Sequence, residues 1–502
     1  MTMKQQLLKT LALGLLLVGG VTSAWGDNTV TVTTGGSSTD YATLKAAIEA
    51  NVLTNATADM TITISADQSL GDKVISWEKA YTLTIKSTKA ITIKGPNGSR
   101  WFTVKNASAN LVVGDGNYEI TLDGEYDGTS SKPRTQAVAL RNNTTASITF
   151  NKVTFKDFNL NNAVNMIVAE NGGGSLTLQN VTISNCVNPK NGYIDNQRVE
   201  NDKVLLKGYL NIDEASTGTA FYLALETKSG GTAGRIKIMD DGFTASKPLS
   251  IEYHETSTSY TPAIGASFVV KDGSLNNFTD AQVKMFTLTD IDKGLVKNNK
   301  DLKLTQAYTL TVSDAGAATL VLPFASTIPT GAACYKLDYT SGDNITATAE
   351  STTLAKDNAV LVIAEAGKYK FVSTATSGSA ATGSGQTSAY GVLVGNYTAD
   401  YVVPASSYIL TKHDDAVGFR KANGTSNKVA AYRAYMTATH SGSAPSFLGI
   451  DFTNGSATAI NAVEKKSAME DGKVYNLQGV RMNAGNLPKG IYVKNGKKFI
   501  VK

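Results

Sequence analysis

Residues 147–158 are SITFNKVTFKDF and residues 175–186 are SLTLQNVTISNC, a match without gaps at an offset of 28 residues (175 − 147). In both copies apolar residues occupy positions 2, 4, 7, 9 and 12. Apolar residues two positions apart indicate a short strand with one buried face. The Asn-Lys or Gln-Asn pair between the two halves indicates a bend. Two strands with a corner that return after 28 residues predict a coil of β-structure stacked on itself.

Short strand patterns of the same kind continue on both sides of this pair, separated by turns rich in glycine. Ahead of them, residues 41–50 contain helix formers that place Leu44, Ala47 and Ile48 on one face. We expect Thr39 or Asp40 to be the N-cap of this helix. A short amphipathic helix suits the end of a β-coil, because an open coil exposes unpaired backbone there. An ordinary surface helix is the alternative.

Residues 28–300 resemble the right-handed parallel β-helix of the pectate-lyase-like superfamily. The segments that carry the resemblance are residues 44–50, the sequence ITLDG at 120–124, and the paired Ser-x-Thr-x-x-x-Val-Thr motif. The resemblance implies a fold rather than one particular activity. We therefore predict an all-β chain whose first domain, residues 27–303, is a right-handed parallel β-helix. An ordinary β-sandwich is the competing architecture for this part.

Around residue 300 the pattern changes to cleanly alternating strands with turns about eight to twelve residues apart, as at 308–312 and 360–363. This spacing predicts a β-sandwich-like domain over residues 304–460. The domain also resembles a module that often precedes sorting tails in exported surface proteins. Its markers here are AATLVLPF at 317–324, Ile328-Pro329, and RAYM at 433–436.

Residues 461–502 are predicted to be a linker and a C-terminal tail of three short strands. The tail resembles the sorting signals of the type IX secretion system, through VYNLQG at 474–479, Gly490-Ile491-Tyr492 and a final basic strand. The resemblance implies that the secretion machinery is a partner of this tail. A hairpin that completes the preceding sandwich is the alternative.

Residues 1–26 have the pattern of a secretory signal peptide. Lys4 and Lys9 precede an apolar stretch at 11–18 that is too short to span a bilayer, and Ala24 or Gly26 offers a small residue for cleavage. A buried N-terminal helix is the alternative. We predict an exported protein, at the cell surface or outside the cell on the exterior of a bacterial outer membrane. No other stretch is long and apolar enough to predict a transmembrane helix.

The net charge and the cysteine content further restrict the class of protein to which the chain can belong. The formal charge is 47 − 42 = +5, and +3 without Lys4 and Lys9, which is too small and too scattered for a nucleic-acid partner. The chain has two cysteines, Cys186 and Cys334, and Cys186 takes the place that Phe158 holds in the other repeat copy. We expect two buried thiols rather than a disulfide.

Several enzymes of this fold cut acidic polysaccharides and need a calcium-binding acidic cluster with a basic residue that removes a proton next to a carboxylate. Asp115, Asp123, Glu125 and Asp127 lie close together in sequence, so Ca²⁺ is the one cofactor hypothesis. Carboxylates beside glycine are also the ordinary filling of exposed turns. We assign no metal site and no catalytic residue.

Aromatic residues near these carboxylates suggest a strip that stacks on sugar rings. Trp77, Trp101, Tyr118 and Tyr126 are its candidates, although a position half in the core is the alternative for Trp101. The candidate ligand-binding residues are therefore Trp101, Asp115, Tyr118, Asp123, Glu125 and Asp127.

Other catalytic patterns are weak. Arg235-Ile236-Lys237 and Asp240-Asp241 are similar to two polygalacturonase motifs, but their order is reversed and a Gly-His-Gly element is missing. A solvated strand face explains them better. The three histidines lack metal-ligand spacing, and no Gly-x-Ser-x-Gly nucleophile elbow occurs.

Two functional hypotheses follow. The first is a non-catalytic exported surface protein that uses a β-helix face for adhesion or for binding an extracellular glycan or another host or microbial surface ligand. The second is a polysaccharide lyase or glycoside hydrolase of the β-helix class. The absence of a clear acid–base constellation in the sequence favours the first hypothesis.

Overall fold

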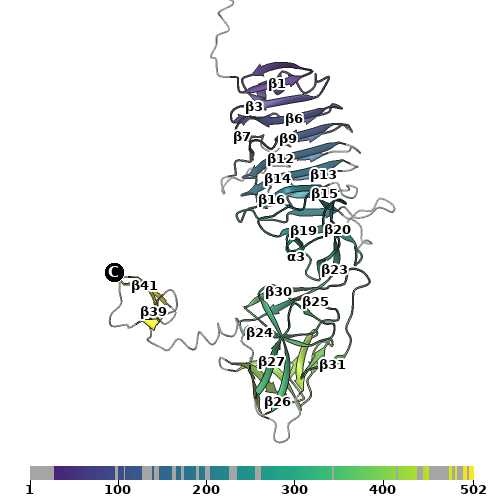
Figure 1. Ribbon diagram of the computed structural model, residues 1–502, viewed down its shortest axis with the longest axis vertical. Coiled ribbons are helices and arrows are strands. Elements are labelled where there is room, and N and C mark those ends of the chain that lie inside the picture. Colours follow the sequence, from purple (N-terminus) through teal and green to yellow (C-terminus); the bar gives the residue numbers. More distant parts are fainter. Residues whose placement is uncertain are drawn as a thin grey trace, which may run out of the picture. The chain divides into compact units, whose positions relative to one another are not determined.

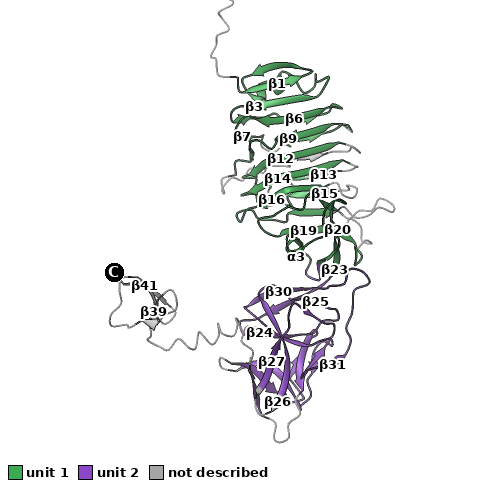
Figure 2. Cartoon of the chain, in the orientation of Figure 1, with its two compact units in different colours: residues 1–290, 295–304 green, residues 291–294, 305–502 purple. Residues whose placement is uncertain are grey.

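The structure of the 502-residue chain is a computed structural model. It describes residues 28–96, 100–106, 108–126, 138–140, 146–160, 166–170, 174–187, 192–197, 204–224, 235–254, 262–341, 344–413, 416–437 and 445–451, together with tail residues 474–476, 481–482, 490–494 and 497–501. The chain divides into two compact units, residues 1–290 with 295–304 and residues 291–294 with 305–502 (Figure 2).

Unit 1 is a parallel β-helix, in which successive coils stack strand upon strand (Figure 1). This confirms the predicted architecture and rules out the sandwich alternative for this part of the chain. One row of parallel strands comprises β3 (Met60–Ile64), β6 (Thr82–Ser87), β9 (Asn110–Val113), β12 (Ser147–Lys156), β14 (Ser175–Ser184), β16 (Val204–Ile212), β18 (Ile236–Ile238) and β20 (Ser267–Lys271).

Two further rows complete the coils. The second row comprises β4 (Gln68–Ser69), β7 (Ile91–Lys94) and β10 (Ile120–Asp123), and it continues through the second halves of β12, β14 and β16. The third row is an eight-stranded sheet of β5 (Ile75–Trp77), β8 (Phe102–Val104), β11 (Val138–Leu140), β13 (Ile167–Glu170), β15 (Ile194–Gln197), β17 (Phe221–Ala224), β19 (Leu249–His254) and β21 (Phe286–Leu288).

The two repeat copies are β12 and β14, and they pair in register along their full length. Ile148 lies beside Leu176, and Phe155 lies beside Ile183. Every inward position of one copy therefore stacks on the inward position of the other, because a parallel ladder preserves the side-chain face from strand to strand. The predicted repeat unit is confirmed.

Large aromatic side chains fill the middle of the β-helix. Phe155 packs edge-on against Phe150 with ring centroids 5.1 Å apart, and Trp101 lies 5.0 Å from Phe158. All four side chains are fully buried. Burial of one such side chain contributes roughly 1.5–3 kcal/mol, so the coils are held together mainly by this apolar interior.

The N-terminal end of the β-helix is closed by antiparallel strands and a helix. Strand β1 (Val30–Thr34) pairs with β3 on one side and with β2 (Ser37–Tyr41) on the other. Helix α2 (Leu44–Glu49) begins after Thr43, whose side chain accepts a hydrogen bond from the backbone of Ala46. The predicted N-caps were wrong because residues 39 and 40 belong to β2, and the helix starts only after the chain leaves that strand.

At the other end of unit 1, helix α3 (Asp280–Val283) is capped reciprocally by Thr279 and Gln282. Strand β20 then pairs antiparallel with β23 (Asp301–Val312), which neighbours β22 (Lys293–Asn298). Strand β23 occupies the edge of β20 on which a further parallel strand would pair. The stack of coils therefore ends there.

Unit 2 is β-sandwich-like, as predicted, and is built around one curled ten-stranded sheet. In spatial order its strands are β24 (Ala317–Leu320), β29 (Val360–Ala364), β26 (Ala332–Ser341), β27 (Asn344–Ala349), β38 (Phe447–Asp451), β35 (Ala416–Lys421), β34 (Ser407–His413), β37 (Arg433–Thr437), β32 (Leu393–Asn396) and β31 (Gln386–Tyr390). Shorter pairs are β25 (Ser326–Thr327) with β28 (Thr353–Leu354) and β33 (Tyr401–Val402) with β36 (Lys428–Val429).

Strand β29 shows how the layers of unit 2 pack. Val360 and Val362 belong to a core with Phe371 of β30 (Gly367–Val372), which pairs antiparallel with β23. Leu361 and Ile363 face the opposite way, into the core enclosed by the curled sheet. Both faces of β29 are therefore buried, which explains its continuous apolar sequence.

The C-terminal tail forms its own sheet, in the order β40 (Arg481–Met482), β39 (Val474–Asn476), β41 (Gly490–Lys494) and β42 (Lys497–Val501). It has four strands rather than the predicted three, because residues 474–482 contribute two short strands instead of one. Among the described strands, those of the tail pair only with one another. The tail therefore does not complete the sandwich.

Two further sequence predictions are tested by the described residues. Cys186 and Cys334 are both buried free thiols, as predicted. No helix in the described part of the chain is long and apolar enough to cross a bilayer.

Candidate functional site

The candidate residues lie on the two turns that flank β10, at successive corners of one coil of the β-helix. Asp115 and Tyr118 lie in the turn before β10, and Asp123 and Glu125 lie at and just after its end. Asp127 lies outside the described residues. Trp101 immediately precedes β8, in the preceding coil.

Asp115 shapes its own turn. Its two carboxylate oxygens accept hydrogen bonds from the backbone N–H of Asn117 at 3.0 Å and from the Asn117 amide at 2.9 Å. The turn is fixed to the neighbouring coil because Lys152 donates to the Asn117 carbonyl at 3.0 Å. Asp115 is thus occupied in the way that aspartates in exposed turns usually are.

Asp123 and Glu125 are occupied by local contacts as well. Asp123 accepts a 2.7 Å hydrogen bond from the backbone N–H of Glu125, which has a left-handed backbone with φ of 58°. The Glu125 carboxylate forms a 3.0 Å ion pair with Lys94, and this contact raises the pKa of the Lys94 amine. Both groups are partly exposed, so the pair contributes little to stability.

The corner that follows β10 carries charged or polar residues in every coil from β7 to β16. We call this set the turn row: Lys94, Asp123, Glu125, Lys156, Asp157 and Asp213. Lys94, Asp123 and Lys156 are register partners, so charge alternates in sign from one coil to the next. Opposite charges on adjacent strands attract, which favours this register.

Asp213, the member of the turn row that follows β16, is surrounded by a dense network of hydrogen bonds. Asp213 accepts from the hydroxyls of Ser184 at 2.7 Å and Ser216 at 2.6 Å, and from the backbone of Asn185 at 3.0 Å. Burial opposes ionisation of Asp213, but these hydrogen bonds together hold its pKa below its ordinary value. The carboxylate stays charged at neutral pH and ties two coils together.

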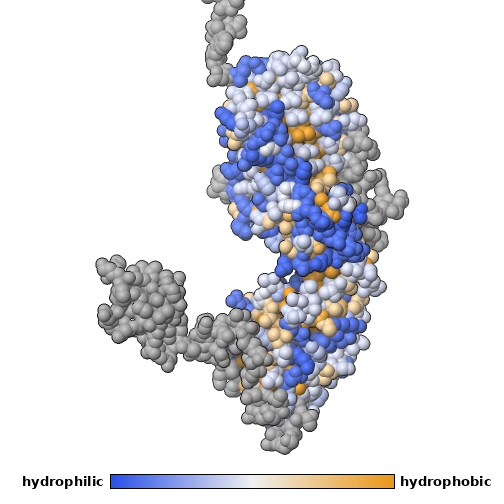
Figure 3. All heavy atoms as spheres, in the orientation of Figure 1, coloured by the Kyte–Doolittle hydropathy of each residue, from blue (hydrophilic) through white to orange (hydrophobic). Residues whose placement is uncertain are grey.

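Beside the turn row, the outward face of the second strand row carries a ladder of hydroxyls. Thr92, Thr121, Thr154 and Thr182 are consecutive register partners, and we call them the threonine row. Each side chain is partly exposed. Adjacent strands lie about 4.8 Å apart, so the hydroxyls recur at that spacing. In Figure 3, hydrophilic residues cover much of the part of unit 1 where Figure 1 labels β7, β12 and β14.

The predicted aromatic strip does not form. Trp101 is fully buried, with its indole N–H donating to the Pro96 carbonyl at 3.2 Å. Trp77 is also fully buried and donates to the Tyr81 carbonyl at 2.8 Å. A buried indole offers no face to a sugar ring, so Trp101 leaves the set of candidate ligand residues. Tyr118, which is 45% exposed, remains available for stacking.

The charged residues similar to polygalacturonase motifs each make their own structural contact. Lys237 pairs with Asp272 at 3.0 Å, and Asp241 pairs with the buried amine of Lys271 at 2.6 Å. Asp240 accepts from the backbone N–H of Gly208 at 2.6 Å. Each of these charged groups is engaged in holding strands or turns together.

The described residues contain no group of three or more histidine, cysteine, aspartate or glutamate side chains arranged to hold a metal ion. The arrangement at the β10 corner presents hydroxyls, lysines and carboxylates along a lateral face. Such a face can form many weak hydrogen bonds with a polyhydroxylated chain, whereas general acid–base chemistry needs two free groups aimed at one point.

Sequence reasoning missed one further place. RAYM at 433–436 is a marker of the module resemblance, yet nothing in the sequence indicates that Arg433 lines a hollow with residues more than one hundred positions earlier. A local sequence pattern does not predict a contact between residues that lie so far apart in the sequence. No family model, no curated protein and no solved structure matches the chain.

Proposed function

We propose that this protein is a non-catalytic exported surface protein that binds an extracellular glycan through the face formed by the threonine row and the turn row. The observation that carries the proposal is the unbroken ladder of outward hydroxyls over four successive coils, Thr92, Thr121, Thr154 and Thr182. Thr154 donates its hydroxyl to the Glu119 carboxylate at 2.8 Å, so this hydroxyl meets a ligand as an acceptor. A regular row of such groups complements a linear chain of sugar hydroxyls, and the contacts add up along the chain.

The charged groups of the turn row, and Asp115 in the turn before β10, support binding rather than catalysis. Asp115 and Asp123 accept backbone hydrogen bonds within their own turns, and Glu125 pairs with Lys94. A general acid or a nucleophile in a glycosidase must be free to exchange a proton or attack the sugar. The β-helix enzyme hypothesis, a polysaccharide lyase or hydrolase, remains as the second candidate because Asp127 adjoins this corner in sequence.

The route to the surface is part of the same proposal. Residues 1–26 act as the signal peptide, and residues 471–502 act as a type IX sorting signal that engages the secretion machinery. The fold family that we propose for unit 1 is the right-handed β-helix of the pectate-lyase-like class. In a producing cell, deletion of residues 471–502 is expected to leave the protein in the periplasm, and unchanged surface display would contradict the sorting role.

The binding proposal is tested with residues 27–502 on an array of pectins, alginates and host glycans. The variant Thr154→Val with Thr182→Val removes two hydroxyls from the threonine row without changing side-chain shape. The matched control is Thr149→Val with Thr177→Val, on the same two strands but before the bend. We expect the first variant to lose at least about tenfold in affinity and the control to bind as the unaltered protein does.

The enzyme hypothesis is tested on the same glycans by following new reducing ends and the absorbance of unsaturated products. We expect no turnover. Turnover that is abolished by Asp123→Ala would establish the second candidate instead.

A further inference from the structure

In unit 2, the first strand of the curled sheet, β24, is hydrogen-bonded to β37, and Thr319 makes two of the contacts. Thr319, on edge strand β24, donates its hydroxyl to the Ala434 carbonyl at 3.0 Å and accepts from the Ala434 backbone N–H at 2.9 Å. Next to it, the Val321 backbone donates to the Tyr432 carbonyl at 3.1 Å. Strands β24 and β37, far apart in the order of the sheet, therefore meet along a seam.

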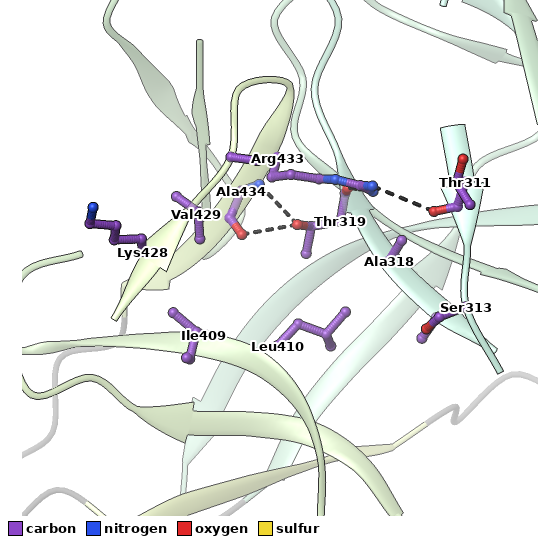
Figure 4. Close-up of a pocket in the computed structure, with 12 residues that line it drawn as sticks. Thr311, Ser313, Ala318, Thr319, Ile409, Leu410, Lys428, Val429, Arg433 and Ala434 are labelled. Carbon is purple, nitrogen blue, oxygen red and sulfur yellow. Dashed lines mark hydrogen bonds between the residues drawn. The ribbon is translucent and has the colours of Figure 1, made fainter. Parts of the chain in front are cut away.

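Arg433 lies across this seam. Its guanidinium donates to the Thr319 carbonyl at 3.1 Å and to the Thr311 carbonyl at 3.4 Å (Figure 4). Among the described residues no carboxylate lies within 4 Å of it. The two carbonyl groups orient the guanidinium but do not neutralise its charge. Their hydrogen bonds use two of its five N–H donors, and three remain for a ligand.

A hollow of about 370 Å³ opens beside Arg433, within the roughly 300–1,000 Å³ typical of small-molecule sites. Ile409 and Leu410 of β34 lie across from Thr319 and Arg433, and Ser313 lies on a third side (Figure 4). Lys428 stands at the rim and is exposed. None of the residues that line the hollow is acidic.

This combination defines the chemistry of the occupant. An oriented guanidinium with spare donors binds a carboxylate better than any neutral group. Strand β34 lines the hollow with Ile409 and Leu410, whose apolar atoms can contact ring C–H groups. The hydroxyls of Thr311 and Ser313 offer partners for ring hydroxyls. A second cation, Lys428, adds attraction for an anion at the entrance.

We propose that this hollow binds a sugar carboxylate, such as a single hexuronate residue or the end of an acidic glycan. The carboxylate sits against Arg433, and the ring lies beside the apolar wall that β34 contributes. The proposal does not depend on glycan binding by the β-helix, because its residues all belong to unit 2 and its ligand is charged.

The test is calorimetric titration of residues 27–502 with galacturonate and glucuronate, alongside galactose and inorganic phosphate. The variant Arg433→Gln removes the charge, and Lys428→Glu reverses the charge at an exposed position, where we expect little change in stability. The matched control is Arg420→Gln, an exposed arginine on β35 that does not line the hollow.

We expect a hexuronate to bind, galactose to bind at least about tenfold more weakly, and both Arg433→Gln and Lys428→Glu to lose at least about tenfold in affinity. Arg420→Gln should bind as the unaltered protein does. Absence of hexuronate binding, or binding unchanged in Lys428→Glu, would overturn the proposal. Phosphate that binds as tightly as hexuronate would show a simple anion site and would equally overturn it.

Discussion

Lys152 and Asn180 occupy equivalent positions of successive coils and share a left-handed backbone, with φ of 61° and 54°. They form the corner at which one strand of each coil turns into the next, so two outward rows of side chains diverge from them. In the following coil the corner belongs to Gly208, with φ of 69°. A β-carbon there would lie 1.9 Å from the Asn180 amide oxygen.

The corner makes a stability prediction. Asn180→Val should lower the free energy of unfolding by roughly 1–3 kcal/mol, because a β-branched residue is strained in a left-handed conformation. Asn180→Gly should change it little. Urea denaturation followed by circular dichroism measures both, and equal midpoints for the two variants would contradict the assignment of strain.

The aromatic interior makes a second prediction. Phe155→Ala should destabilise unit 1 by about 3–5 kcal/mol, because it leaves a cavity between Phe150 and Phe158. Tyr118→Ala, at an exposed position in the same region, should change stability by less than about 0.5 kcal/mol. The urea midpoints of the two variants are the measurement, and a small effect at Phe155 would refute the described packing.

Asp213 makes a prediction about pH. Hydrogen bonds from Ser216 and Ser184 hold its folded pKa below the ordinary value of 3.8. The stability that this carboxylate supplies is therefore present above pH 3.8 and is lost as the pH falls through the lower folded pKa.

The corresponding experiment compares Asp213→Asn with the unaltered protein. The variant should be less stable at pH 7, and the difference between the two urea midpoints should shrink below pH 3.8. Glu214→Gln, the exposed neighbour, is the control and should follow the unaltered protein. A difference that stays constant from pH 7 to pH 2.5 would exclude the Asp213 network as its source.

The burial of both thiols predicts that they react slowly with thiol reagents. Burial raises the pKa of Cys186 and of Cys334 to about 12, so neither is a thiolate at neutral pH. A chromogenic disulfide reagent should label neither cysteine in the native protein and both in urea. Fast labelling of one native thiol would show that its core is open to solvent.

Sequence patterns were sufficient for the scaffold. The alternation in residues 147–158 and 175–186 fixes which side chains face inward, and a parallel ladder then brings like positions together. The corner was also predictable, because Asn and Lys in a break between strands favour a bend. The buried thiol of Cys186 follows from its alignment with Phe158.

The position of Trp101 was not predictable from alternation. Trp101 and Phe102 are adjacent yet both buried, because the chain folds the indole over Gly95, where a β-carbon would lie 2.1 Å from the ring. The N-cap of α2 was also predicted wrongly, because residues 39 and 40, where the cap was expected, belong to β2. Arg433 and Thr319 meet only because the ten-stranded sheet curls. A local sequence pattern does not predict how far a sheet curls.

Glycan binding by the threonine row is tested most directly by comparing the affinities of two double variants. Thr154→Val with Thr182→Val should bind the best array glycan at least about tenfold more weakly than Thr149→Val with Thr177→Val. Equal affinities for the two variants would contradict the claim.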